Sequence, residues 1–276
     1  MTRIATLLAI FLLALGDCAA QSPVTKLIDD LLTRQLLSTD RTDHINSALQ
    51  FLSAGTRFEN HWQVNQSIKP DYLNVFLMKP GLRTDPNGPP ELKPYYGSCA
   101  YLGENNIVLC DLDFLNSFLE KRDIKNDMSD QDSFLIWVLG HELGHIVKNH
   151  KAAHFGEDSF EQLVDSKTLD QRQEVEADVF LVERVLTNKD QTTNLARMLI
   201  DVLNAEIRSK VGNDLPPGVG IIFDYTNKKI VRYMTLRRHP EFVVRTTRML
   251  QQIGSTKGNE SLRSMTDAFA RHLREG

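Results

Sequence analysis

The chain has 276 residues, of which 41% are hydrophobic and 25% are charged, the composition of an ordinary folded protein. Its net charge is -4 and its sequence has no long basic stripe, so composition gives no electrostatic basis for binding nucleic acid. The length suffices for one large domain or two small ones.

The N-terminus, residues 1–20, has the layout of a secretory signal peptide. Arg3 precedes an apolar run that ends at Leu15, small residues follow, and cleavage after Ala20 fits this pattern. The run is too short to span a bilayer comfortably, and no later segment is apolar for long enough. We therefore expect an exported chain without a transmembrane segment after the signal peptide, with the periplasm as its compartment. An uncleaved anchor and a lipid-modified Cys18 are the alternatives.

The rest of the chain alternates helical and strand-like patterns. Residues 21–70 are predicted to be an N-terminal helical segment, because Leu and Ile recur there at helical spacing. Residues 71–276 are predicted to form a second unit, which opens with a strand and a loop rich in Pro and Gly. Further elements are predicted as helices near 112–122, 132–150, 172–187 and 192–211 and from Pro240 onward, and as a hairpin at 218–234. The predicted fold class is α+β, rich in helix, with a small antiparallel sheet.

A pair of cysteines would remain after cleavage of the signal peptide. The segment YYGSCAYLGENNIVLCD, residues 95–111, is typical of two short strands around a turn at Glu104-Asn105. In that hairpin Cys99 faces Cys110 directly, at a distance that a disulfide can bridge. An even number of cysteines in an exported chain favours a disulfide, and two free buried thiols are the alternative.

The stretch WVLGHELGHIVKNH, residues 137–150, indicates a metal site on a helix that begins with a capping signal at Ser129 to Asp132. His141 and His145 are four residues apart, so both imidazoles project from one helix face, one turn apart. Two imidazoles in this arrangement can bind one Zn²⁺ ion, and Glu142 beside them can take a proton from a water molecule that the ion activates. Gly140 and Gly144 leave room for another element to approach closely.

The third zinc ligand is expected in EVEAD, residues 174–178, on a later helix. Glu174 and Asp178 are four apart and share a face, so Glu174 is the predicted ligand and Asp178 the predicted acceptor for the second ring N–H of a ligand histidine. Glu176 points elsewhere and is predicted to be a solvated surface charge. His150 lies five residues beyond His145, on another face, and is predicted to cap the helix or to support the site from outside.

With these motifs the chain resembles the HtpX and CAAX prenyl endopeptidase family of gluzincins. The family pattern is H-E-x-x-H, then E-x-x-A-D, then a His-Pro with an Arg six residues after the His, which RRHPEFVVRTTRML matches at His239 and Arg245. The resemblance implies a zincin-like metallopeptidase domain over residues 71–276, with His239 and Arg245 over the zinc as catalytic residues that stabilise the oxyanion. Many members of the family are integral membrane proteins, and this chain is more similar to the soluble, exported members, although it lacks their tandem helical repeats.

The function implied is that of an exported zinc endopeptidase that hydrolyses peptide bonds of envelope or misfolded proteins. The strand at 106–110 is the predicted sheet edge on which a peptide or unfolded protein would pair. One alternative is a non-proteolytic, metallopeptidase-like binding module for envelope proteins. Another is a zinc hydrolase of the peptide deformylase type, in which Cys99 would be a metal ligand.

Overall fold

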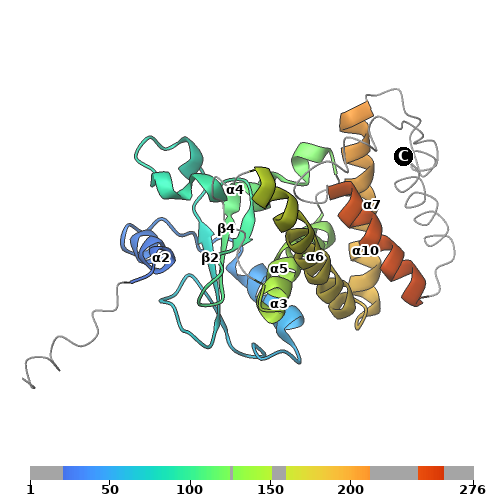
Figure 1. The fold of residues 1–276 in the computed structure, drawn as a ribbon, viewed down its shortest axis with the longest axis horizontal. Helices are drawn as coiled ribbons and strands as arrows, with labels where there is room; N and C mark the ends of the chain where they lie inside the picture. Colours follow the sequence, from blue (N-terminus) through green and yellow to red (C-terminus); the bar gives the residue numbers. More distant parts are fainter. Residues whose placement is uncertain (1–20, 125–126, 151–159, 212–241, 258–276) are drawn as a thin grey trace, which may run out of the picture.

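The computed structural model describes residues 21–124, 127–150, 160–211 and 242–257. Helices and a small sheet are arranged in successive layers, and the predicted α+β class is confirmed (Figure 1). The predicted signal peptide with Cys18 and the predicted hairpin at 218–234 lie outside the described residues.

Four short strands form a mixed sheet in the order β1-β2-β4-β3. They are β1 (Trp62–Val64), β2 (Leu73–Met78), β3 (Cys99–Tyr101) and β4 (Ile107–Asp111). Strand β2 pairs in parallel with both β1 and β4, and only β3 pairs antiparallel with β4. The prediction of an antiparallel sheet was therefore wrong for these parallel pairs. Hairpins can be recognised from local turn residues, whereas parallel pairing joins strands that are distant in sequence.

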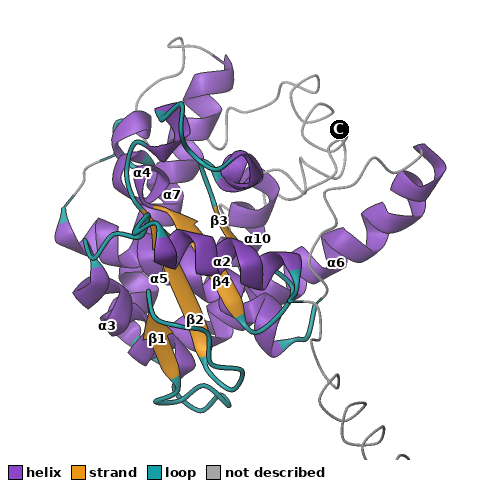
Figure 2. Cartoon of the chain, turned by 90° about the vertical axis from the view of Figure 1, so that its left-hand side faces the viewer, coloured by secondary structure: helices purple, strands orange, loops and turns teal. Residues whose placement is uncertain are grey.

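The two faces of the sheet bury different residues of the same strands. In β2, Val75 and Leu77 face one hydrophobic cluster, while Phe76 and Met78 face the other. This alternation is the two-residue period of a strand that is buried on both sides. Helix α2 (Pro23–Thr33) covers the second face, and α3 (Thr42–Ser53) and α5 (Met128–Val147) lie on the first (Figure 2).

The remaining helices extend the layer on the α5 side. They are α4 (Leu112–Ser117), α6 (Phe160–Val185), α7 (Lys189–Val211) and α10 (Phe242–Lys257), with short 3-10 turns η1 (Leu82–Thr84), η2 (Pro90–Tyr95) and η3 (Glu120–Arg122). In Figure 1, α6 crosses α5, and α7 and α10 lie beyond it on the side away from the sheet. Within the described part of the chain, no helix combines the length and the apolar character that crossing a membrane requires.

The N-cap of helix α5 is Asp127, two residues before the predicted capping residue Ser129. The carboxylate of Asp127 accepts a hydrogen bond from the backbone N–H of Asp130 and caps the helix, so Ser129 and Asp132 lie within its first turns. Asp is among the best N-cap residues, and its carboxylate also interacts favourably with the positive end of the helix dipole.

The close crossing of α5 and α6 depends on a glycine. A Cβ added at Gly144 would lie 2.8 Å from the Cα and the carbonyl oxygen of Ala177, closer than real Cβ atoms approach backbone. A Cβ at Gly140 would meet only side-chain atoms, those of Leu181 and Leu52. Gly144 therefore allows the backbones of the two helices to touch at the level of the predicted metal ligands, as its place in the sequence indicated.

The predicted disulfide is confirmed. Cys99 and Cys110 are directly opposite in the β3–β4 pair and are bonded, with their Cα atoms 4.0 Å apart. The neighbouring backbone bonds, Leu102 N–H to Ile107 and Asp111 N–H to Ser98, place this pair at a non-hydrogen-bonded position, where opposite Cα atoms approach most closely. Both cysteines face the α5 side of the sheet, so the disulfide fastens β3 above that helix.

Candidate metal centre

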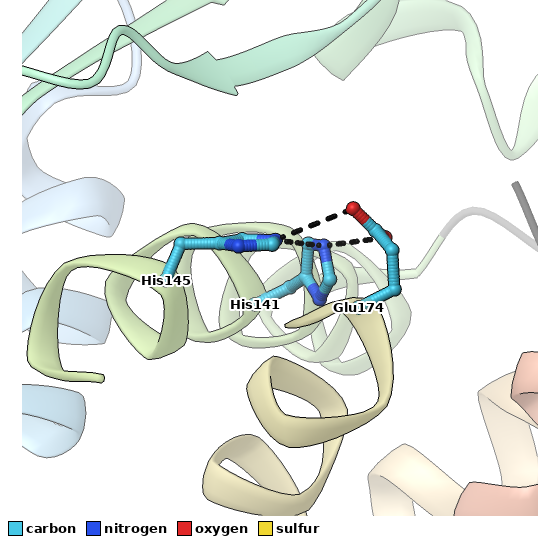
Figure 3. A group of neighbouring side chains, drawn as sticks. All are labelled: His141, His145 and Glu174. Atoms are coloured by element: carbon cyan, nitrogen blue, oxygen red, sulfur yellow. Dashed lines mark hydrogen bonds and ion pairs between the residues drawn. The ribbon is translucent and has the colours of Figure 1, made fainter. Parts of the chain in front are cut away.

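Three side chains from two helices meet at one point. His141 and His145 project from α5, and Glu174 reaches them from α6 (Figure 3). The Nε2 atoms of the two histidines are 3.0 Å apart. Nε2 of His141 lies 3.2 Å from one carboxylate oxygen of Glu174, and Nε2 of His145 lies 3.5 Å from the other. Such a group of neutral and anionic ligand atoms could hold a metal ion.

Asp178 holds the ring of His141 from behind. One of its carboxylate oxygens lies 3.0 Å from Nδ1 of His141, and both side chains are buried. A carboxylate can only accept here, so a proton lies on Nδ1, and Nε2, the atom that faces His145 and Glu174, is the one that would give up its proton to bind a metal. The predicted geometric relation between Asp178 and a candidate ligand histidine is therefore present.

Arg245, on α10, joins the two carboxylates of α6. Its Nε and Nη2 atoms donate to the two oxygens of Asp178 at 2.9 and 2.8 Å, and Nη1 lies 2.9 Å from Glu174. Two parallel N–H donors on one carboxylate fix the orientation of both groups. The guanidinium also lies against the ring of His141, with Nη2 2.9 Å from Nδ1. Arg245 thus belongs to the candidate site, and its predicted role towards an oxyanion stays a prediction.

Glu142 is buried beside this group and is held by the sheet. Its carboxylate accepts a hydrogen bond of 2.7 Å from the backbone N–H of Tyr101 in β3. Burial raises the pKa of Glu142 to about 7, although the charge of His141 and the hydrogen bond from Tyr101 act in the opposite direction. A carboxyl group with a pKa near neutrality suits general acid–base chemistry. The sequence did not point to Tyr101, because a backbone N–H contributes no residue-specific signal.

The charges of the other groups are strongly coupled. Burial lowers the pKa of His145 to about 3, and the charge of His141 acts in the same direction. For His141, burial and Arg245 oppose protonation, but hydrogen bonds to Asp178 and Glu174 outweigh them and raise its pKa to about 9. Burial also disfavours ionised Glu174, yet the bond from His141 and the charge of Arg245 lower its pKa to about 2. The lowered pKa of Glu174 means that its carboxylate stays ionised beside cationic neighbours, as it would beside a metal ion.

Two residues near the site make contacts that their spacing alone did not show. His150, predicted as a cap or a support, is buried, and its ring contacts His145. Glu176, predicted to be a solvated charge, is exposed, and it also contacts the far side of the His150 ring at 3.0 Å. A helical wheel of α6 alone does not show this contact, because it depends on how the end of α5 folds back.

Other predicted site residues are placed as follows. His239 lies outside the described residues. Cys99 is bonded to Cys110 and therefore offers no thiolate to the group of His141, His145 and Glu174, which contradicts the deformylase-type arrangement.

Strand β4, predicted as the sheet edge, lies between β2 and β3, so among the described strands β3 forms the edge near α5. The prediction was wrong because β4, which follows β3 in the chain, returns between β2 and β3 and leaves β3 outermost.

The chain matches no protein-family model, and searches of curated proteins and of solved structures found no match either. The family resemblance consequently rests on the motif residues themselves, and the site must be interpreted from its own geometry.

Proposed function

We propose that this chain is an exported zinc-dependent endopeptidase. The observation that carries the proposal is the convergence of His141, His145 and Glu174 beside the buried carboxylate of Glu142. Two imidazoles and one carboxylate form a ligand set of known zinc hydrolases, and a carboxylate next to them is the usual partner for moving a proton.

The spacing of these atoms fits a zinc ion. Ligands at zinc–nitrogen distances of 2.0–2.1 Å in a tetrahedron are separated by about 3.3 Å. The separations among the three side chains, 3.0, 3.2 and 3.5 Å, bracket this value. Three protein ligands would leave a further position open, as catalytic rather than structural zinc sites do.

The residues around the ion would divide the catalytic work. Bound zinc would supply Lewis acidity, polarising a peptide carbonyl and making a water molecule acidic. Glu142 would accept the proton of that water at its carboxylate and return it to the leaving amine, while the N–H of Tyr101 keeps the carboxylate oriented. Asp178 would hold His141, and Arg245 would hold Asp178 and Glu174 in place.

The edge of β3 supports a peptide as substrate. Backbone bonds to β4 are made by Ser98 and Leu102, so the backbone groups of Cys99 and Tyr101 point away from β4. The N–H of Tyr101 reaches Glu142 on this side, which shows that the edge runs past the site. An extended segment of an unfolded protein could pair as an added strand with the other outward backbone groups of this edge, since the N–H of Tyr101 is bonded to Glu142. The disulfide is consistent with an oxidising compartment such as the periplasm, where envelope and misfolded proteins would be the substrates.

The test is to compare the wild-type chain with Glu142→Gln in zinc content and in cleavage of a disordered protein. The substitution keeps the size of the side chain and removes its ability to take a proton. We expect equal zinc content and turnover lower by about 100- to 10,000-fold. Equal turnover in both proteins would refute the proposal. Binding of unfolded protein with no cleavage by the wild type would instead favour the metallopeptidase-like binding module.

A further inference from the structure

The two histidines of the candidate site differ in what their Nδ1 atoms contact. Nδ1 of His141 contacts the carboxylate of Asp178, whereas Nδ1 of His145 contacts another histidine. The Nδ1 atom of His145 lies 3.0 Å from Nδ1 of His150. The opposite nitrogen of that ring, Nε2 of His150, lies 3.0 Å from a carboxylate oxygen of Glu176. A continuous chain of contacts thus leads from Glu176 through His150 to His145.

The end of α5 explains why His150 can reach back to His145. Asn149 has a left-handed backbone, with φ of 55°, and reverses the chain after the helix. The N–H of His150 then donates to the carbonyl of His145 at 2.9 Å, and that of Asn149 to Ile146 at 3.1 Å, which is the pattern of a Schellman C-cap. The two imidazole rings lie 5.0 Å apart between centroids and nearly perpendicular. His150 therefore contacts His145 twice, through its backbone N–H and through its ring.

The contacts define where the protons lie. Glu176 can only accept when ionised, so Nε2 of His150 is the donor in that bond. The two Nδ1 atoms of His150 and His145 can form a direct hydrogen bond, which makes Nδ1 of His150 the acceptor and Nδ1–H of His145 the donor. The two Nε2 atoms of His141 and His145 also lie 3.0 Å apart, but there a shared metal ion would accept both lone pairs. The lone pair of His145 then lies on Nε2, the atom that faces His141 at 3.0 Å and Glu174 at 3.5 Å.

We infer that His150 and Glu176 are positioning residues that hold His145 in the tautomer and orientation needed to bind the metal. The inference rests on the proposed metal centre and extends it. The two histidines would each be supported by a carboxylate of α6, His141 directly by Asp178 and His145 indirectly by Glu176. His150 is buried, with 6% of its surface exposed, whereas the side chain of Glu176 is 47% exposed, so the histidine should matter more.

Zinc affinity, measured on the full chain by competition with a chelator, tests the inference without relying on activity. Loss of a residue that orients a metal ligand typically weakens metal binding by 10- to 100-fold. We expect a loss in this range for His150→Phe, which keeps an aromatic ring but cannot accept the bond, and a smaller loss, near its lower end, for Glu176→Ala. His150→Asn can present an oxygen close to the position of Nδ1 and should retain most of the affinity, as should Glu176→Gln.

The control is Glu183→Ala, which removes another exposed carboxylate two turns further along α6 and should leave zinc affinity unchanged. Thermal unfolding of each variant shows whether it is folded, and NMR of the imidazole nitrogens reports the tautomer of His145.

A purely structural role for His150 would make Asn the worse replacement and Phe the better one, and that result would overturn the inference. Unchanged affinity in both His150 variants would overturn it as well. Failure of the wild-type chain to bind zinc would refute the metal centre itself. Equal turnover of the wild type and Glu142→Gln would refute the endopeptidase alone, and the zinc affinities of the His150 variants would still decide the positioning role.

Discussion

The two faces of the sheet bury alternate residues of the same strands, but only one of them leads to polar chemistry. On the α2 face, Phe76 and Met78 pack in a cluster of apolar side chains that also includes η1 and η2. On the α5 face, the strands pack on a helix that is itself crossed by α6, and the candidate metal centre lies at that crossing. The alternation of apolar side chains along a strand is enough to build both hydrophobic clusters, whereas the candidate metal centre also needs α6 to pack on α5.

The difference also concerns how buried charge is tolerated. Asp178 and Glu174 are both largely buried, and Arg245 from α10 contacts both of them. Ions removed from water are expensive unless every charge has a partner. The α5 face can hold such groups because three helices, α5, α6 and α10, deliver opposite charges to one place.

Removing the largest side chain of β2 on the α2 face should have the greatest effect on stability. Phe76 is fully buried, and Phe76→Ala should lower the free energy of unfolding by about 3–5 kcal/mol. Because the α5–α6 crossing is on the other face, zinc affinity of the folded protein should not change. Urea denaturation and chelator competition measure the two quantities. Met128→Ala is the control, since Met128 is 58% exposed and its loss should alter stability by less than about 0.5 kcal/mol. A large loss of zinc affinity in Phe76→Ala would break the comparison.

Removing the disulfide should have the next largest effect. Replacing both Cys99 and Cys110 by Ala should lower the free energy of unfolding by about 2–4 kcal/mol. The disulfide joins β3 to β4, and β3 supplies the N–H that holds Glu142, so peptide turnover should fall further than zinc affinity, whose ligands are on helices. Wild-type protein treated with a reductant should show the same pattern. If turnover and zinc affinity fell in parallel, β3 would not act through Glu142.

The smallest loss of stability is expected for a substitution at the crossing of α5 and α6, but this substitution should lower zinc affinity. The added methyl in Gly144→Ala would press on the backbone of Ala177, which should cost about 1–3 kcal/mol and move Glu174 away from the histidines. Zinc affinity should therefore fall. Gly140→Ala is the matched control, because its methyl would press on the buried side-chain ends of Leu181 and Leu52, at 2.5 and 2.9 Å, and not on the backbone of α6. It should also cost stability, but it should leave zinc affinity unchanged. Equal zinc affinities in the two variants would show that backbone contact at residue 144 does not set the position of α6.

Local spacing predicted several features that the structure contains. A separation of four residues puts His141 and His145 on one side of a helix whatever that helix packs on, and the same holds for Glu174 and Asp178. The register of Cys99 and Cys110 followed from the position of the turn between them. The α+β class followed from the alternation of helical and strand-like patterns.

Glu174 and Asp178 were predicted to meet the histidines of another helix, but other features that join distant segments were not predicted. The parallel pairing of β2 with β4 and the edge position of β3 depend on how a long connection returns to the sheet. Glu176 is exposed, as predicted, but its contact with His150 was not, because that contact depends on the reversal of the chain at Asn149. In each case the partner lies on another element, and nothing in the residue's own surroundings in the sequence identifies it.

The amino-acid order by itself determined the ligand types, their spacing on each helix and the cysteine register, because these follow from the fixed geometry of a helical turn and a hairpin. Only the tertiary structure decided that Glu174 meets the two imidazoles, that Arg245 links the two carboxylates and that Tyr101 holds Glu142. These contacts require helices and a strand far apart in the chain to pack at a backbone distance that a glycine permits, and packing of that kind is a property of the whole core.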